Sequence, residues 1–300
     1  MIFSFSFPNS RTQFAAILLL LQIPLTGLIA AATPGETNTN TNTNSINGAG
    51  AHFSWVIFDR LKPILEQKTG RTIQLYGKNS ALGLGCNAAI KNAVRYTPQQ
   101  ETFGFVCCAL HADEVAKNKI EVYPLAEEPI LVIVNQSNPV TNLSIEQVRN
   151  IFSGKITNWS EVGGYDKPIV VVTRLHCKNR PGHWKTILPH AKKFRADRLD
   201  VPGAVDMVRK VTDFNDAIGH VGSTWKFSKA DRVKRITVNH VEATAENLKL
   251  KKYPFYRTLS AVTKKGVSGD VVKLIKEVQH GHTFHSIADD YDLLPLNTAK

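Results

Sequence analysis

The chain has 300 residues, of which 43% are hydrophobic, so it can bury one large core or two medium ones and is not expected to be disordered. Its formal net charge of +12 at pH 7 favours an anionic ligand, partner or surface. Lys and Arg are spread along the whole sequence without a zinc-finger, RNP or basic-helix pattern, which argues against nucleic-acid binding.

The amino-terminal segment has the features of an export signal. Arg11 precedes an apolar run over residues 14–32, which is interrupted by a Pro-Leu-Thr-Gly stretch and ends in an Ala-x-Ala cleavage pattern. We interpret residues 1–32 as a cleaved signal peptide, with a retained membrane anchor as the alternative. After cleavage we expect a periplasmic or secreted protein with no stable membrane insertion. Residues 33–45, a Thr-Asn repeat with nothing to bury, predict a flexible tether.

Short apolar strands and amphipathic helices alternate from Ile46 onward. Segment 46–70 predicts a strand end, a Gly-rich turn and a helix closed by Gly70. Further strands are predicted in 71–77, 102–110, 167–173 and 217–222 and twice within 120–140, and further helices in 78–94, 142–159, 206–214 and 269–279, with one more beginning near 181–184. This alternation predicts an α/β chain with mostly parallel sheets. In such sheets ligands lie beyond the carboxyl ends of strands, where the loops after Ile46, Tyr76 and Thr173 would meet.

Four cysteines, Cys86, Cys107, Cys108 and Cys177, would enter an oxidising compartment on export. Their even number favours one or two disulfides, whose connectivity the sequence leaves open. A bridge between the adjacent Cys107 and Cys108 would require a strained geometry. Cys86 falls near the first turn of a predicted helix, where free amides and the helix dipole favour anions and lower the pKa of a thiol.

The stretch "TRLHCKNRPGHWKTI", residues 173–187, follows a predicted buried strand. Its His176-Cys177 pair suggests a cysteine phosphatase loop, but His183 stands where that loop needs an arginine to clamp the phosphate. A thiol enzyme based on Cys177 stays an alternative, although the sequence places no acid to orient a base. We expect no catalytic residue and no enzymatic activity.

Five stretches along the chain carry a family pattern: "GAGAHF" at 48–53, "FGFVCCAL" at 103–110, "IFSGKITNW" at 151–159, "KPIVVVTR" at 167–174 and "AIGHVG" at 217–222. Together they resemble the periplasmic solute-binding protein superfamily, in particular the phosphate-binding proteins of phosphate ABC importers. "IFSGKITNW" is the most specific of them, and the likeness covers nearly all of residues 46–296.

The resemblance implies a two-lobed α/β periplasmic binding protein fold, type II-like, with the ligand cleft between the lobes and closure on binding. One lobe would comprise residues 46–125 plus 238–300, and the other residues 126–237. The implied function is that of an exported protein that captures a small inorganic oxyanion, phosphate-like, for an ABC importer or a sensor. An ABC permease is then a candidate partner, and we expect a monomer.

The family's ligand-binding groups are mostly replaced when they are carried over position by position. Arg174 matches the arginine that clamps the oxyanion, but His52 stands for a Thr and Cys107 for an Asp. Losing the acidic acceptor would loosen selectivity between protonated phosphate and sulfate. The resemblance thus implies a ligand-binding set of His52, Ser80, Cys107, Arg174, His176, Lys178 and Arg180.

A soft metal or metalloid site is the alternative interpretation of the same replacements. Thiolates and imidazoles suit zinc, copper(I) or a thiophilic metalloid better than they suit phosphate oxygens. The candidate metal ligands are Cys86, Cys107, Cys108, His176 and Cys177. A structural disulfide from Cys86 to Cys107 or Cys177 is the simpler alternative. Apart from such a metal ion, we expect no cofactor.

Several other polar residues are expected to have no ligand role. His183 is interpreted as a packing or helix-start residue. Glu127 and Glu128 are neighbours on a predicted strand, so they point to opposite faces and cannot share a substrate. A solvated helix face is predicted for three further histidines: His280, His282 and His285.

Overall fold

The computed structural model describes residues 44–77, 85–177 and 179–296. The expected signal peptide, 1–32, and most of the expected tether lie outside the described residues. Ser45, which we placed at the end of the tether, is the first residue of a buried strand. Within the described ranges, no helix combines the length and the apolar character that crossing a bilayer requires.

Strands and helices alternate along the described chain. The strands are β1 (Ser45–Gly50), β2 (Thr72–Tyr76), β3 (Glu101–Val106), β4 (Ile120–Asn135), β5 (Asn142–Leu143), β6 (Val170–Thr173), β7 (Leu199–Asp200), β8 (Ala217–Gly222), β9 (Val233–Val238), β10 (Tyr256–Lys264) and β11 (Leu294–Pro295). The α-helices are α1 (Arg60–Thr69), α2 (Gly85–Ala93), α3 (Ala112–Asn118), α4 (Ile145–Ser153), α5 (Ala204–Asp213), α6 (Ala245–Lys249), α7 (Asp270–His280) and α8 (His282–Asp290). Short helices of other pitch are η1 (Trp55–Asp59), η2 (Trp159–Val162), η3 (His183–Thr186) and η4 (Ala191–Lys193).

The strands form a mixed sheet, which corrects our expectation of mostly parallel pairing. The main strand order is β2-β1-β3-β10-β4-β8-β6-β7. β1 pairs in parallel with β2 and β3, and β6 pairs in parallel with β7 and β8. β4 and β10 pair with each other in antiparallel fashion. β10 is also antiparallel to β3, and β4 is also antiparallel to β8. Two parallel groups are therefore joined by a long antiparallel pair.

β4 is one continuous strand of 16 residues, so our prediction of two strands within 120–140 is wrong. The strand contains Pro124 and Pro129, and proline cannot donate a ladder hydrogen bond. The pairing with β10 changes register beside Pro124 and leaves Leu125 without a partner on β10. A bulge of this kind accommodates a proline without ending the strand.

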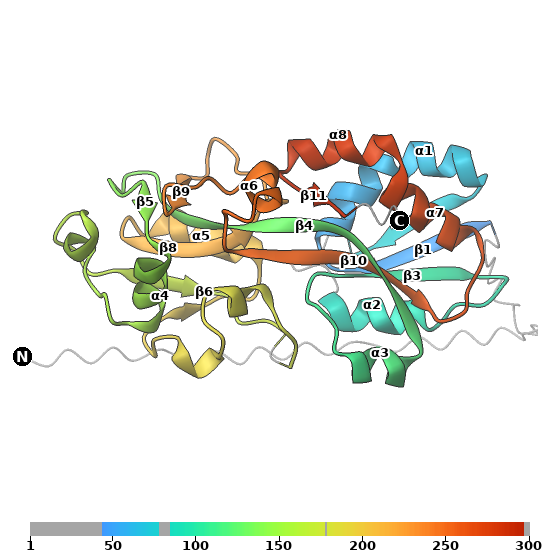
Figure 1. Cartoon of the computed structure of the whole chain (residues 1–300), viewed down its shortest axis with the longest axis horizontal. Coiled ribbons are helices and arrows are strands. Elements are labelled where there is room, and N and C mark those ends of the chain that lie inside the picture. Colours follow the sequence, from blue (N-terminus) through green and yellow to red (C-terminus); the bar gives the residue numbers. More distant parts are fainter. Residues whose placement is uncertain (1–43, 78–84, 178, 297–300) are drawn as a thin grey trace, which may run out of the picture. The chain divides into compact units, whose positions relative to one another are not determined.

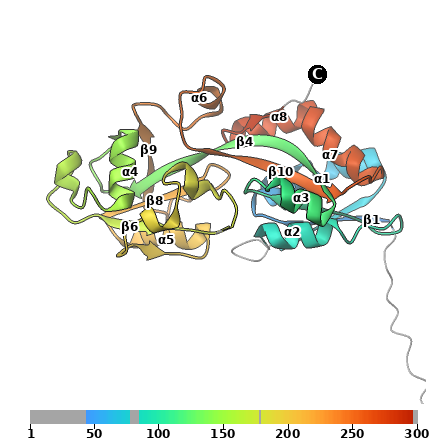
Figure 2. The same ribbon diagram turned by 60° about the horizontal axis from the view of Figure 1, so that its bottom comes forward.

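Two hydrophobic cores define the two lobes. The first is built from residues between 46 and 126 together with residues between 259 and 293, and the second from residues between 130 and 255. β4 and β10 run side by side from one lobe to the other (Figures 1 and 2). In the first lobe, α1, α7 and α8 lie on one side of the strands and α2 and α3 on the other (Figure 1). Each lobe thus has its own buried interior, and the paired strands link them.

The second lobe extends further along the chain than the boundary at residue 237 that we expected. Tyr253 and Phe255 are buried in its core, and the Tyr253 hydroxyl donates a hydrogen bond to the Ile130 carbonyl at 2.8 Å. The chain therefore returns to the first lobe only along β10.

α4 has a hydrogen-bonded cap at its first turn and a glycine at its end. The Ser144 side chain accepts from the Gln147 amide at 3.0 Å, the Gln147 side chain accepts from the Ser144 amide, and Gly154 ends the helix in a left-handed conformation. The helix that we expected to begin near 181–184 is only the short turn η3. Pro189 follows closely, and a proline disfavours helical geometry in the residue before it.

The position of α2 depends on a close approach to β3. A Cβ atom on Gly104 would lie 2.2 Å from the carbonyl oxygen of Ala89, so no side chain fits between the helix and the strand. This contact fixes the first turn of α2 near the carboxyl ends of β1 and β3.

Candidate functional site

A cavity of about 330 Å³ lies between the lobes. Its wall is formed by the loop after β1, the first turn of α2, the segment after β3, the loop after β6, and residues of β8 and β10. The loops after β1 and β6 and the start of α2 therefore meet, as the topology of parallel strands led us to expect. Charged, polar and thiol side chains line the cavity: His52, Cys86, Asn87, Cys107, Arg174, His176, Cys177, Arg180, His183, His220, Thr224 and Arg257.

The structure brings together most of the residues that the sequence singled out. Of the predicted ligand-binding set, the residues that line the cavity are His52, Cys107, Arg174, His176 and Arg180. Ser80 and Lys178 lie outside the described residues. The exposed His280 and His282 belong to α7 and α8, away from this wall.

Arg174 follows the last residue of β6 directly and reaches into the cavity. Its Nε donates to the carbonyl oxygen of Pro202 at 2.9 Å, which holds the start of the guanidinium in place. Among the described residues, no carboxylate forms an ion pair with it. Burial lowers the pKa of Arg174, but an arginine remains charged at any physiological pH. The cavity thus contains a positive charge that no carboxylate of the described segments neutralises.

Arg257, on β10, is a second cation of the cavity that sequence reasoning missed. It forms an ion pair with Glu128 on β4, whose side chain is fully buried. Glu128 also accepts a hydrogen bond from the Thr224 amide at 2.9 Å and another from the Thr224 hydroxyl. Arg257 lies in the stretch "KKYPFYRTL", but nothing local marked it, because its partners are distant in sequence. The pair fixes the guanidinium rather than leaving it free.

Arg180 lines the cavity but is engaged elsewhere. Its Nε donates to both carboxylate oxygens of Glu114 on α3, at 3.1 and 2.9 Å, and its Nη2 donates to the Asn87 side chain at 2.7 Å. This contact raises the pKa of Arg180 and lowers that of Glu114. We predicted that Arg180 would bind the ligand, whereas the structure uses it to link the loop after β6 to the first lobe.

Buried imidazoles form the floor of the cavity. His183 Nε2 and His220 Nδ1 lie 3.0 Å apart, and Arg257 Nη1 lies 3.2 Å from His183 Nδ1. His183 therefore packs as we expected, but against polar groups. His52 Nδ1 and His220 Nε2 are buried without a hydrogen-bond partner among the described residues.

Burial of His220 makes stability depend on pH. The side chain is 1% exposed, and burial lowers its pKa from 6.5 to about 3, with the nearby cations His176, Arg174 and Arg257 acting in the same direction. His183 lies against it. As the pH falls below 6.5, the unfolded chain takes up a proton on His220 that the folded protein does not. The contribution of His220 to the free energy of unfolding is therefore fully present above pH 6.5 and is lost as the pH falls toward 3.

We therefore expect the free energy of unfolding to fall between pH 6.5 and pH 4, by up to about 1.4 kcal/mol for each pH unit from this residue. Urea unfolding at several pH values measures the slope. His220→Gln should flatten it, and His280→Gln, a change on the surface, should not. An equal slope in all three proteins would contradict this origin.

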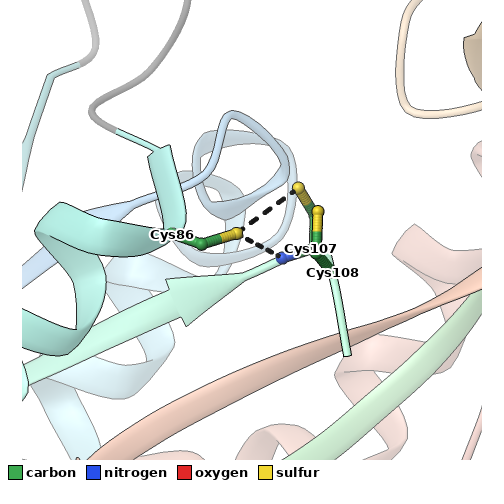
Figure 3. Close-up of side chains that lie close together, drawn as sticks. All are labelled: Cys86, Cys107 and Cys108. Carbon is green, nitrogen blue, oxygen red and sulfur yellow. Dashed lines mark hydrogen bonds between the residues drawn. The ribbon is translucent and has the colours of Figure 1, made fainter. Parts of the chain in front are cut away.

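The four thiols lie close together, with Cys86, Cys107 and Cys177 in the wall of the cavity and Cys108 buried behind them. Cys86 Sγ lies 3.9 Å from Cys107 Sγ and 3.4 Å from the Cys107 amide nitrogen (Figure 3). Cys108 Sγ lies 2.7 Å from Cys177 Sγ and 3.4 Å from His176 Nε2. All four cysteines are unbridged, and the closest pair is not one that we proposed as a disulfide. Contact with the Cys108 thiol lowers the pKa of Cys177 to about 4, while sulfur contacts raise that of Cys108.

Comparison with known proteins gives one family and several relatives. A family model described as a PBP superfamily domain matches residues 38–279. The phosphate-binding protein PstS of Bacillus subtilis is 25% identical over 190 residues, which are 61% of this chain and 62% of the relative. The protein of the same name from Borreliella burgdorferi is 23% identical over 63% of this chain and 72% of the relative. The match thus spans less than two thirds of the Bacillus protein.

Solved structures extend the likeness to the fold. One, assigned as a phosphate ABC transporter substrate-binding protein of Clostridium perfringens with bound phosphate, has a TM-score of 0.68 and 25% identity, and the match covers 84% of this chain and 100% of that one. An ABC-type phosphate transport receptor from Vibrio cholerae has a TM-score of 0.62 at 23% identity, with 84% and 100% covered. The two-lobed fold is therefore shared with structures of phosphate-binding proteins.

Proposed function

Because the chain belongs to the PBP superfamily, we propose that it binds a small inorganic oxyanion of the phosphate type in the cavity between its lobes. It would do so without catalysis, as an exported periplasmic or secreted protein that delivers the anion to an ABC importer or a sensor. The relatives that are named phosphate-binding proteins support this choice of ligand. We propose a monomer with an ABC permease as its partner.

The main support for the proposal is the guanidinium of Arg174 in the cavity wall. A half-buried guanidinium that has no carboxylate partner among the described residues is costly unless an anion binds it. An oxyanion can accept two parallel N–H bonds from such a group. The geometry of Arg174 therefore favours a negatively charged ligand over a neutral one.

Groups from the other elements complete an anion site. The first turn of α2, with Asn87 in the cavity wall, presents the amides and the positive end of the helix dipole. His52 Nδ1 and His220 Nε2 lack partners among the described residues and can supply further hydrogen bonds. Since α2 belongs to the first lobe and Arg174 to the second, an anion that contacts both favours the closed arrangement.

Calorimetric titration of the purified protein with phosphate, arsenate and sulfate tests the proposal. We expect binding of one anion per chain, driven by charge-assisted hydrogen bonds. The absence of binding heat with all three anions at several temperatures would contradict the proposed anion binding.

Selectivity between phosphate and sulfate is expected to be weak. Among the described residues that line the cavity, none is acidic, so no carboxylate of this lining accepts a hydrogen bond from the hydroxyl of the hydrogen phosphate ion. Without such an acceptor, fully deprotonated sulfate meets no repulsive group. We expect the two dissociation constants to differ by less than about tenfold, or 1.4 kcal/mol. Competition titrations measure the ratio, and a preference of several thousandfold for phosphate would contradict this explanation.

A further inference from the structure

The cysteine cluster suggests a second binding site in the wall of the same cavity. We propose that Cys86, Cys107 and Cys108, joined by Cys177, bind a thiophilic d10 cation such as Zn²⁺. The proposal goes beyond oxyanion binding and does not depend on it, because none of the four thiols is needed to hold an anion on Arg174.

Distances within the cluster fit a metal site. The ligand atoms of Cys86, Cys107 and Cys108 all lie within 4.8 Å of one another, and so do those of Cys108, His176 and Cys177. The Cys86–Cys107 separation of 3.9 Å is close to the separation of about 3.8 Å between two sulfurs that bind one tetrahedral zinc ion at about 2.3 Å each. Cys108 belongs to both groups and therefore links them.

The surroundings of the thiols favour the thiolate form that metals require. The Cys107 amide points at Cys86 Sγ, at 3.4 Å, and Cys86 is the second residue of α2, where the helix dipole stabilises negative charge (Figure 3). The bound metal ion would itself balance the charge of its thiolate ligands.

The ligands come from both lobes. Cys86, Cys107 and Cys108 belong to the first lobe, on α2 and directly after β3, whereas Cys177 belongs to the loop after β6. An ion held by three thiolates of the first lobe would reach its fourth ligand only when this loop is close. Filling the site would therefore stabilise the closed arrangement of the lobes.

A disulfide between Cys108 and Cys177 is the competing outcome. Their sulfurs, 2.7 Å apart, are too distant for a bond of about 2.05 Å and too close for two ligands of one zinc ion. A disulfide engages only this pair, whereas a metal also accounts for the approach of Cys86 to Cys107. We favour the metal because it uses every thiol of the cluster.

The test is a titration of the full-length, reduced, metal-free protein with Zn²⁺, without phosphate, and a parallel titration with Cd²⁺ to observe thiolate-to-metal charge-transfer absorption. We expect one ion per chain, the appearance of that absorption, and proton release. Cys107→Ser should abolish tight binding. Cys177→Ser, at a half-buried position where folding is not at risk, should weaken binding at least about tenfold, as loss of even an outer-shell partner does.

A matched control uses the histidines of α8. The double variant His282→Ala/His285→Ala removes two side chains whose rings lie 6.4 Å apart, and it should leave the stoichiometry and affinity unchanged. Three results would overturn the proposal: no stoichiometric Zn²⁺ uptake by the reduced protein, Zn²⁺ uptake that persists in Cys107→Ser, or a native protein that contains two disulfides and no thiol. Phosphate binding is measured in a separate titration of the zinc-free protein. A negative result with Zn²⁺ therefore contradicts the metal site without contradicting anion binding.

Discussion

Arg174→Ala is expected to abolish phosphate binding at concentrations where the natural protein is saturated. The guanidinium is the cavity's cation without a carboxylate partner among the described residues, and hydrogen bonds between charged groups contribute more than neutral ones. Losing two of them should cost about 3 kcal/mol or more, which weakens binding by roughly 100-fold or more. Arg174→Lys retains the charge but not the planar fork, so an intermediate loss is expected. Calorimetry and competition with arsenate measure the three affinities.

Arg209→Ala is the matched control for this experiment. Arg209 lies on α5 of the same lobe, its side chain is 63% exposed, and it pairs with Asp206 at 2.7 Å. The variant removes the same charge from the protein without touching the cavity, so its affinity should stay within about twofold of the natural protein, as expected for a screened surface charge. Equal losses in both variants would show that net charge, and not the site, governs binding.

Among the single substitutions proposed here, Glu128→Gln is expected to lower the free energy of unfolding the most. Glu128 is fully buried, and it is the carboxylate that neutralises Arg257, whose side chain is only 13% exposed. The amide has nearly the same shape, but it leaves the guanidinium charge buried without its partner. Breaking a buried pair in this way typically costs about 3–5 kcal/mol. Denaturant unfolding, followed by tryptophan fluorescence, measures the change in the free energy of unfolding.

Asp292→Asn supplies the comparison on the surface. Asp292 pairs with Arg235 at 3.1 Å, and the Arg235 side chain is 54% exposed, so water already screens the pair. Its loss should change stability by less than about 1 kcal/mol. If Glu128→Gln were no more destabilising than this variant, the buried pair would not be the anchor of Arg257 that we describe.

The sequence predicted features that depend on neighbouring residues. The helix predicted within residues 142–159 is present as α4, whose Ser144–Gln147 cap and Gly154 end are local patterns. The loop after Thr173 could be placed at the edge of the sheet because it directly follows a buried strand, whereas the resemblance singled out Arg174 within it. The two-lobed fold came from a resemblance and not from these patterns.

Features that depend on distant partners could not be predicted. Arg257 meets Glu128 across 129 positions, and Cys108 meets Cys177 across 69. Sequence patterns relate residues that are only a few positions apart, so they cannot predict such contacts. The continuity of β4 also depends on a distant partner, because the bulge in its pairing with β10 accommodates Pro124.

The paired strands β4 and β10 also limit how the two lobes can move. A two-stranded ribbon bends and twists readily, but sliding one strand along the other would break its row of hydrogen bonds. The relative motion of the lobes is thereby limited to bending and twisting of this pair, whose pairing is irregular at Leu125 in the first lobe. Any ligand that holds both lobes acts on this motion. An anion on Arg174 and a cation among the thiols would each shift the same equilibrium, so either one would improve the affinity for the other.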